Sequence, residues 1–442
     1  MLAKNLSDEL KKSVIYQMFL RSFNAAGTLK SAEKMLEGIK ELGVDIVYLC
    51  PICEADDDEK YEYWSDRQKA SKLGNPKNPY RIKNYFKIDS EYGTDEDLKS
   101  FVKTAHSLGV KVMLDLVYFH CGPNADFIEE NPEFVMRDEK GDIIYGEWHF
   151  PQLNFKSAQL REYLIENMLY FVKEFDVDGY RCDVGDKIPL DFWSDAIKKV
   201  KEIKPSLIMI NEGDKPEFIE KDFDFNYNYG WAVGVRCAFL GKNPATIIEE
   251  KWNWYQSLIK NNHGLRSIET HDITNDDHEN RIEKTLGHNA VEAMFVLNFM
   301  MDGLPLIYNG NEDCDIAQHS IYSNRFYGGY HIDRSGVPKE AADRRRRILK
   351  ELSDIKKNVS EIYDGTVEFL KNSNQDRVVT VKRERDKKVY VIVNTSDDNQ
   401  ITEFTASEPK QIIIAKENTS YKFDNDTITV KLPPYGYIVL SE

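Results

Sequence analysis

The sequence has no long apolar run, no excess of positive charge and no leader-like N-terminus. No stretch of about 18 consecutive apolar residues occurs, so no transmembrane helix is predicted. The formal net charge of −16 argues against nucleic acid or an anionic membrane as the partner. Residues 1–12 are polar and lack a signal-peptide core. We therefore expect a cytoplasmic protein, or one from which a leader has been removed.

Cysteine is also sparse, and its spacing predicts neither a disulfide framework nor a zinc site. The six cysteines are at positions 50, 53, 121, 182, 237 and 314. A chain of this length does not need disulfides for its stability, and no zinc-type Cys/His spacing occurs. Cys50 and Cys53 have the spacing of a redox motif but lack a thioredoxin-like context. The sequence therefore predicts no metal and no redox centre.

Strand-like and helix-like segments alternate regularly through most of the 442 residues. Helical periodicity occurs over residues 31–42, 95–108, 158–176, 190–203 and 340–358. The apolar runs between them predict strands at residues 14–19, 45–49, 112–117, 179–183, 207–211, 223–227, 265–269 and 303–308. Continuous apolar strands that alternate with helices are typical of a parallel sheet covered on both faces. Eight such units predict an α/β fold, a closed (β/α)₈ barrel.

Two segments interrupt this rhythm and predict attachments to the barrel. Residues 121–155 are rich in proline, glycine, charge and aromatics, so we expect a small inserted subdomain after the third strand. From residue 364 the pattern changes to short alternating strands at 366–371, 377–382, 388–394 and 427–432, which predicts a C-terminal antiparallel β-sandwich over 364–442. The predicted barrel comprises residues 1–120 and 156–363.

The loop at residues 54–76 is charged and holds Tyr61, Tyr63 and Trp64. Two interpretations are open. The loop is either an ordinary surface loop with half-buried aromatics or a platform on which a sugar stacks, and we favour the first.

Four of the predicted strands end in an acid. Asp115, Asp183, Glu212 and Asp272 each follow an apolar segment. In a (β/α)₈ barrel the carboxyl ends of the strands meet at one face, and that face carries the chemistry. Acids far apart in sequence are therefore expected in one pocket. Two carboxyl groups that flank one bond are what glycoside hydrolysis requires.

The neighbours of these acids favour distinct roles, although each has a plainer explanation. Arg181 lies two residues before Asp183 on a strand, so both side chains point the same way, and the guanidinium favours an ionised carboxylate. Such a carboxylate can attack an anomeric carbon, or it can be half of a structural ion pair. Glu212 beside apolar residues can act as a general acid and base, or cap a strand. His120, His271 and Asp272 can bind sugar hydroxyls.

Several ordered motifs resemble those of the α-amylase family, glycoside hydrolase family thirteen. The resemblance covers the whole chain, and no single motif is as specific as their order. The motifs lie at residues 15–23, 88–94, 115–120, 150–155, 179–183, 210–212, 271–272 and 307–310.

The resemblance implies a role for each site residue. Asp183 would be the nucleophile, Glu212 the general acid and base, and Asp272 the stabiliser of the transition state. Arg181 would orient Asp183, and Asp115 would support Arg181. The sugar on the non-reducing side of the cleaved bond would then be bound by three further residues, namely Tyr80 stacked beneath it and His120 and His271 on its hydroxyls.

The sequence also departs from the family pattern. Phe119 stands where relatives carry an asparagine that binds structural calcium, and a phenyl ring offers no oxygen to an ion that takes six to eight. We therefore expect no cofactor and no calcium. Gly185, Asp186 and Lys187 stand where many amylases have a Lys-His pair, so the leaving-group side is expected to differ. Val184 also occurs in some relatives that cut α-1,6 bonds.

These features predict a retaining α-glucoside hydrolase that cleaves α-1,4 bonds of maltooligosaccharides or α-glucans through a covalent intermediate. The same site could serve an α-1,6-glucosidase, or a glucanotransferase, isomerase or phosphorylase. A non-catalytic barrel is a further alternative, although such relatives usually lack one of the acids. The expected partner is an α-linked glucose oligosaccharide, with no nucleic acid and no membrane. The sequence leaves open endo or exo cleavage, chain length and oligomeric state.

Overall fold

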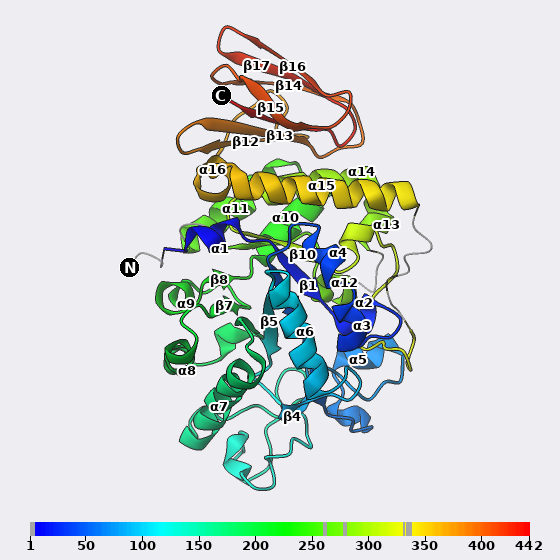
Figure 1. Ribbon diagram of the computed structural model, residues 1–442, viewed down its shortest axis with the longest axis vertical. Coiled ribbons are helices and arrows are strands. Elements are labelled where there is room, and N and C mark those ends of the chain that lie inside the picture. The colour runs from blue at the N-terminus through cyan, green and yellow to red at the C-terminus, as the bar shows by residue number, and fades with distance from the viewer. Residues whose placement is uncertain (1–4, 260–262, 277–280, 330–331, 333–337) are drawn as a thin grey trace.

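The computed structural model describes residues 5–259, 263–276, 281–329, 332 and 338–442. Within them the fold is a (β/α)₈ barrel followed by antiparallel sheets, as predicted (Figure 1). Eight parallel strands pair in the order β8-β7-β6-β5-β2-β1-β10-β9. Their bounds are β1 Ile15–Met18, β2 Ile46–Leu49, β5 Lys111–Leu116, β6 Gly179–Cys182, β7 Ile208–Asn211, β8 Phe225–Asn226, β9 Leu265–Arg266 and β10 Leu304–Tyr308.

Among the residues described, one parallel bridge joins the two outermost strands and closes the barrel. Asn226 of β8 pairs with Gly264, which directly precedes β9. The strands β1, β2, β6, β7 and β10 are buried along their whole length. This burial accounts for their continuous apolar sequences, since both faces of a barrel strand are covered.

Helices surround the barrel, and their caps follow ordinary rules. α6 begins after Thr94, whose side chain and that of Asp97 form a capping box. The longer helices are α6 Asp95–Ser107, α7 Ala158–Phe175, α8 Leu190–Ile203, α10 Tyr229–Phe239, α11 Thr246–Leu258, α14 His288–Met300 and α15 Lys339–Asn358. The shorter ones are α1 Asp8–Lys12, α2 Leu20–Phe23, α3 Leu29–Glu33, α4 Leu36–Lys40, α5 Asp66–Ser71, α9 Pro216–Lys221, α12 His271–Asp276, α13 Ile282–Leu286 and α16 Ser360–Asp364.

The single helix predicted over residues 31–42 is wrong in detail. The segment forms two short helices, α3 and α4, which are separated at Lys34 and Met35. Met35 has φ −103° and ψ −4°, and this departure from helical geometry interrupts the helix. The apolar periodicity holds across the break, so Ala32, Leu36 and Ile39 are still buried together.

The predicted insertion at residues 121–155 lies next to the segment 53–88, since the Gly122 N–H donates to the Ile82 carbonyl at 2.7 Å. β3 Cys53–Ala55 and β4 Ile82–Ile88 form a two-stranded antiparallel sheet, and the chain between them carries α5 and a 3₁₀ turn, η1 Tyr61–Tyr63. Residues 121–155 contain one further 3₁₀ turn, η2 Pro132–Phe134, and isolated bridges such as Val135 to Leu153. Two more 3₁₀ turns, η3 Gly185–Lys187 and η4 Asn311–Asp313, follow barrel strands.

The C-terminal part consists of two antiparallel sheets. One has five strands in the order β11-β12-β13-β18-β15, and the other has three in the order β14-β17-β16. Their bounds are β11 Thr366–Phe369, β12 Val378–Glu384, β13 Lys388–Asn394, β14 Gln400–Thr405, β15 Gln411–Ala415, β16 Ser420–Asp424, β17 Thr427–Leu432 and β18 Tyr437–Ser441. In Figure 1 the gold helix α15 lies between these sheets and the barrel. No helix among the described residues is both long and apolar enough to cross a membrane.

Candidate active site

One buried arginine brings three carboxyl groups together at the carboxyl ends of the strands. The Nη1 of Arg181, on β6, donates to both oxygens of Asp115 at 2.7 and 2.9 Å and to Asp183 Oδ1 at 2.9 Å. Its Nη2 lies 2.8 Å from Glu212 Oε2. Asp115 is on β5, and Asp183 and Glu212 directly follow β6 and β7. Asp183 and Glu212 are therefore held near each other by two nitrogens of one planar group.

Asp115 lies beneath this arrangement and is fixed by two phenols. The Tyr48 hydroxyl donates to Asp115 Oδ2 at 2.6 Å, and the Tyr80 hydroxyl donates to the same oxygen at 3.1 Å. Burial raises the pKa of Asp115, while the neighbouring Arg181 opposes that rise. Asp115 thus orients Arg181 and Tyr80.

His120 presents an unpaired nitrogen within the site. Its Nε2 lies 2.8 Å from the carbonyl oxygen of Tyr80, which only accepts hydrogen bonds, so Nε2 carries the proton. Nδ1 is then an acceptor, and it is buried with no hydrogen-bond partner among the described residues. Burial lowers the pKa of His120 to about 4, so the ring is neutral at pH 7. A sugar hydroxyl would supply the missing donor.

His271 is held by contacts that determine its tautomer. The side-chain amide of Gln17 lies 2.7 Å from Nδ1, and Gln17 Oε1 accepts from the His271 backbone N–H. Nδ1 therefore accepts, and Nε2 carries the proton. Nε2 lies 2.5 Å from the Tyr80 hydroxyl and 3.3 Å from Asp272 Oδ2, and the rings of Tyr80 and His271 stack at 5.5 Å.

Glu212 accepts two further hydrogen bonds. The Tyr229 hydroxyl donates to Oε1 at 2.7 Å, and the Val184 backbone N–H donates to Oε2 at 2.7 Å. Val184 has φ 39°, a left-handed conformation that costs energy for a β-branched residue. This strained turn places the Val184 N–H against Glu212. The Tyr229 hydroxyl also lies 3.5 Å from Asp272 Oδ2, so it links the two acids.

The acids differ in their affinity for a proton. Burial, followed by the charge of Glu212, raises the pKa of Asp183 well above its ordinary value, and Arg181 only partly offsets this. Arg181 itself acts to lower the pKa of Asp183, in the direction expected from the sequence, and a proton on Glu212 removes the charge that opposes it. Burial also acts to raise the pKa of Asp272, but His271 and Arg67 together lower it below its ordinary value.

A cavity of 310 Å³ connects these groups. Its volume is at the low end of the roughly 300–1,000 Å³ typical of small-molecule sites. Asp183, Glu212 and Asp272 all line it, and so do Tyr80 and His120. Arg181, His271 and Asp115 lie behind these lining residues. The remaining lining residues are Ser65, Arg67, Asn78, Trp148, Phe150, Val184, Tyr229, Ile273, Ile321 and Tyr322.

The loop at residues 54–76 contributes more to the site than its sequence indicates. The aromatic rings of this loop pack mainly against other rings, and none of them lines the cavity. Tyr61 is exposed and stacks on buried Trp64, and Tyr63 stacks on Tyr145 at 5.1 Å. Ser65 and Arg67 from the same loop line the cavity, and Arg67 Nη1 lies 3.5 Å from Asp272 Oδ1. No local pattern marks Arg67 as a site residue, because its contact with Asp272 spans more than 200 residues of chain.

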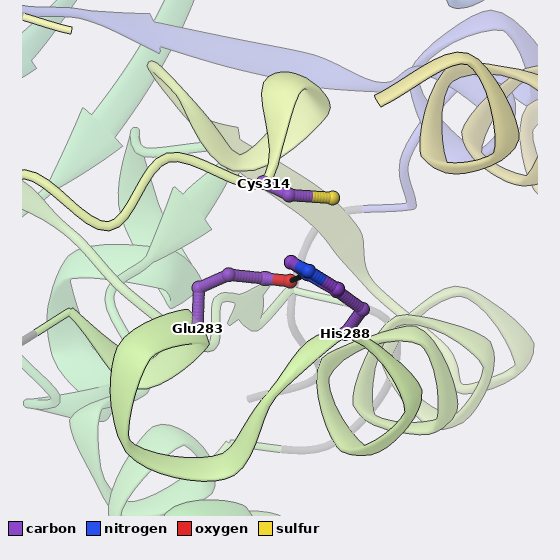
Figure 2. A group of neighbouring side chains, drawn as sticks. All are labelled: Glu283, His288 and Cys314. Atoms are coloured by element: carbon purple, nitrogen blue, oxygen red, sulfur yellow. Dashed lines mark hydrogen bonds and ion pairs between the residues drawn. The ribbon is translucent and has the colours of Figure 1, made fainter. Parts of the chain in front are cut away.

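A second group of potential metal ligands lies away from the cavity. Figure 2 shows Glu283 of α13, His288 of α14 and Cys314 after η4, whose ligand atoms all lie within 4.8 Å of one another. Glu283 is already engaged: Oε1 lies 2.5 Å from His288 Nδ1, and both oxygens accept from Arg345 at 3.1 Å. Burial raises the pKa of the Cys314 thiol to about 12. The group is thus an ion-pair network that links α13, α14 and α15.

Comparison with known proteins establishes the class of this site. Residues 14–141 and 138–364 match the catalytic domain of the alpha-amylase family. The barrel of this chain, with its strand-end acids, belongs to that family, and the protein is a glycoside hydrolase.

Individual relatives are identical to this chain at about a quarter of the aligned positions. A cyclomaltodextrinase from Geobacillus thermopakistaniensis is 24% identical over 449 residues, which cover 93% of this chain and 70% of the relative. A maltogenic alpha-amylase from Bacillus acidopullulyticus is 27% identical over 404 residues, which cover 84% of this chain and 63% of the relative. The crystal structure of a noncanonic maltogenic alpha-amylase from Thermotoga neapolitana superposes with a TM-score of 0.82 at 26% identity, over 98% of this chain and 99% of that one.

Proposed function

We propose that the protein hydrolyses α-1,4 bonds of maltooligosaccharides with retention of configuration, and that Asp183 is the nucleophile. The observation that carries this proposal is the pair Asp183 and Glu212 on one guanidinium, beside a cavity that both line. Two carboxyls held close together, about 5–5.5 Å apart in retaining enzymes, leave no room for a water between base and sugar. The first attack must then come from a carboxylate.

The first step transfers the sugar to the enzyme. An oxygen of Asp183 attacks the anomeric carbon while the bond from that carbon to the glycosidic oxygen breaks. Glu212 gives its proton to the departing oxygen, so the leaving chain departs as an alcohol. Arg181 keeps Asp183 oriented, and Tyr229 and the Val184 N–H keep Glu212 oriented.

The second step returns the enzyme to its starting state. Water attacks the anomeric carbon, its proton passes to Glu212, and the bond to Asp183 breaks. The Asp272 carboxylate, whose pKa is lowered, stays ionised and stabilises the positive charge that develops on the sugar ring. His120 Nδ1 accepts from one sugar hydroxyl, and His271 with Asp272 binds others.

We further propose that the loop around the site needs no calcium. Within the loop at residues 54–76 and its flank, the buried guanidinium of Arg81 donates to the carbonyl oxygens of Tyr63, Asp56, Asp58 and Pro76 at 2.9 to 3.0 Å. Carbonyl oxygens are the ligands that calcium prefers. Here a protein cation engages them. EDTA should therefore leave the melting temperature unchanged, and a large decrease would refute this.

A cytoplasmic location is part of the same proposal. Its support is a 27% identity over 201 residues, 42% of this chain, to an intracellular maltogenic amylase of Bacillus subtilis. Cell fractionation of the source organism with an antibody to the protein would test it, and recovery from the culture medium would contradict it.

The catalytic assignment is tested by two substitutions that keep side-chain shape. Asp183→Asn and Glu212→Gln should each reduce kcat on maltotetraose by about 10²–10⁴-fold or more, which is the usual contribution of such groups. Externally added azide should restore Glu212→Gln in part with activated substrates, but not Asp183→Asn. Unchanged turnover in either variant would overturn the assignment. A product with inverted anomeric configuration would overturn the retaining mechanism.

A further inference from the structure

Part of the active-site cavity is lined by two segments that hydrogen-bond to each other. The first segment runs from β3 to β4 and carries α5, and the second follows β10. The Ser65 and Tyr322 hydroxyls lie 3.2 Å apart, and the Asn75 side chain donates to the Tyr322 carbonyl at 2.9 Å. Ser65 and Tyr322 are both buried, and both line the cavity. The two segments thus form a continuous wall.

A buried arginine fastens this wall from behind. Arg21 Nη1 donates to the carbonyl of Ile321 at 2.8 Å and to that of Lys77 at 3.1 Å, so one nitrogen holds one residue from each segment. The rest of the guanidinium is bidentate on Glu91 at 2.8 and 2.9 Å. A buried, charge-assisted network of this kind resists displacement by a substrate. The wall is therefore part of the fold rather than a loosely held loop.

Arg67 projects from this wall toward Asp272. It lies on α5, two residues after Ser65, and its Nη1 is 3.5 Å from Asp272 Oδ1. Asp272 is the acid that we assign to hydroxyls of the first sugar on the non-reducing side of the cleaved bond. A guanidinium at this distance from Asp272 is within reach of a sugar that Asp272 binds. It can donate to a terminal hydroxyl while Asp272 accepts from the adjacent one.

We propose that this wall makes the enzyme an exo-acting glucosidase that removes single glucose units from the non-reducing end. The inference rests on the proposed function and adds which bond of a chain is cut. Arg67, Ser65 and Tyr322 are the specificity-determining residues, because they occupy the space that a second sugar on that side would need.

A consequence is that substrates without a free non-reducing end are excluded. Cyclic maltodextrins have no such end, so they should be poor substrates even though relatives are named cyclomaltodextrinases. A linear chain whose terminal sugar carries a bulky group on its 4- and 6-hydroxyls should be excluded for the same reason. Both substrates contain the same α-1,4 bonds as an ordinary maltooligosaccharide. A difference in their rates therefore reports whether the chain can enter the site, not whether the bond can be cleaved.

The test compares p-nitrophenyl α-maltopentaoside with its 4,6-O-benzylidene derivative, and products are resolved by chromatography. Because a pocket of fixed size rejects a bulkier terminal ring, we expect kcat/KM to be roughly 100-fold lower for the blocked compound. Glucose should be the first small product from the free compound. Equal rates would overturn the proposal, and so would initial release of maltose. No cleavage of either compound would overturn the hydrolase function itself.

Variants locate the effect in the wall. Arg67→Ala and Tyr322→Ala should raise the ratio of kcat/KM for the benzylidene derivative to kcat/KM for the unmodified substrate. Tyr322→Phe keeps the ring and should change this ratio less. Lys69→Ala is the matched control on α5, since its ammonium pairs with Asp66 at 3.7 Å and does not line the cavity. A ratio that is the same in Arg67→Ala, Tyr322→Ala and Lys69→Ala would overturn the role of the wall.

Discussion

Lys356 of α15 is fully buried, and its ammonium group has no carboxylate of its own as a partner among the described residues. Its Nζ donates to the carbonyl of Met301 at 3.2 Å. Burial, and then the nearby Arg383, lower its pKa to about 7, with Asp302 only partly opposing. Asp302 itself is paired with Arg266. Lys356 therefore costs stability whenever it must be protonated in the folded state.

This position gives a pH-dependent prediction for Lys356→Met. An unfolded lysine has a pKa of about 10.4, so between pH 7 and that value the unfolded chain binds the extra proton and stability rises with pH. Below pH 7 the ammonium is charged in both states, so the full cost of burying it destabilises the fold. Removing it should outweigh the loss of one hydrogen bond, which is worth about 1 kcal/mol. We expect Lys356→Met to raise the melting temperature more at pH 6 than at pH 9.5.

Thermal unfolding at the two pH values checks this, with Lys350→Met as the control. Lys350 is on the same helix, α15, and its exposed ammonium pairs with Asp354. A stabilisation of equal size at both pH values would contradict the argument from burial.

Arg81 illustrates how one residue supports a whole loop. Arg81→Met keeps the aliphatic bulk but leaves four carbonyl oxygens without their donor. Each buried unsatisfied group costs about 1–3 kcal/mol, so we expect a loss of several kcal/mol in the free energy of unfolding. Because the same loop carries Ser65 and Arg67, KM should rise as well. Denaturant titration and kinetics on maltotetraose would measure the two effects, and neither effect would appear if the loop were held by its other contacts alone.

At the scale of elements, the network around Glu283 joins three helices. Arg345 of α15 binds both oxygens of Glu283 and also donates to the carbonyls of Asn311 and His288. Breaking a buried pair by removing one partner leaves an uncompensated charge, which costs about 3–5 kcal/mol. We expect Glu283→Gln to lower the free energy of unfolding by that amount.

An exposed pair provides the control for this prediction. Lys199 Nζ lies 3.0 Å from Glu162 Oε2, and both side chains are largely exposed. Pairs of that kind contribute little, typically under about 1 kcal/mol. Lys199→Ala should therefore have a small effect in a urea titration of both variants, and a larger effect than that of Glu283→Gln would reverse our ranking of the two pairs.

How far the elements are predictable from sequence depends on how they are buried. The strands β1, β2, β5, β6 and β7 are covered on both faces, so their apolar runs identified them. β14 alternates exposed and buried residues over most of its length, β16 has no buried residue, and neither strand is predicted from the sequence. The strand-end acids were found because each follows an apolar strand. Arg67 and Tyr229 were missed, because an arginine in a charged loop or a tyrosine at the start of a helix carries no local sign of a distant partner.

At the scale of the whole molecule, the C-terminal sheets share a hydrophobic core with the barrel. Inward-facing residues of β12, β13 and β18, including Val381, Val391 and Val439, belong to the same buried cluster as the barrel strands. Polar contacts cross the boundary too. Tyr437 donates to the buried Glu292 at 2.8 Å, and Arg383 donates to the carbonyl of Met300 at 2.7 Å. The boundary seen in the sequence at residue 364 is therefore a change of element type, with packing continuous across it.

This continuity predicts that the barrel and the C-terminal sheets unfold together. Calorimetry should give one transition whose van't Hoff and calorimetric enthalpies agree, since separating the parts would expose a shared apolar face. Tyr437→Phe removes one buried hydrogen bond between the two parts, and Glu292 keeps its partner Arg344. We expect it to lower the free energy of unfolding by about 1 kcal/mol and to leave a single transition. Two resolved transitions in the wild type would show that the shared core does not couple the two parts. In that case truncation after residue 364 would leave a folded, active barrel, whereas a coupled core makes such a truncation insoluble.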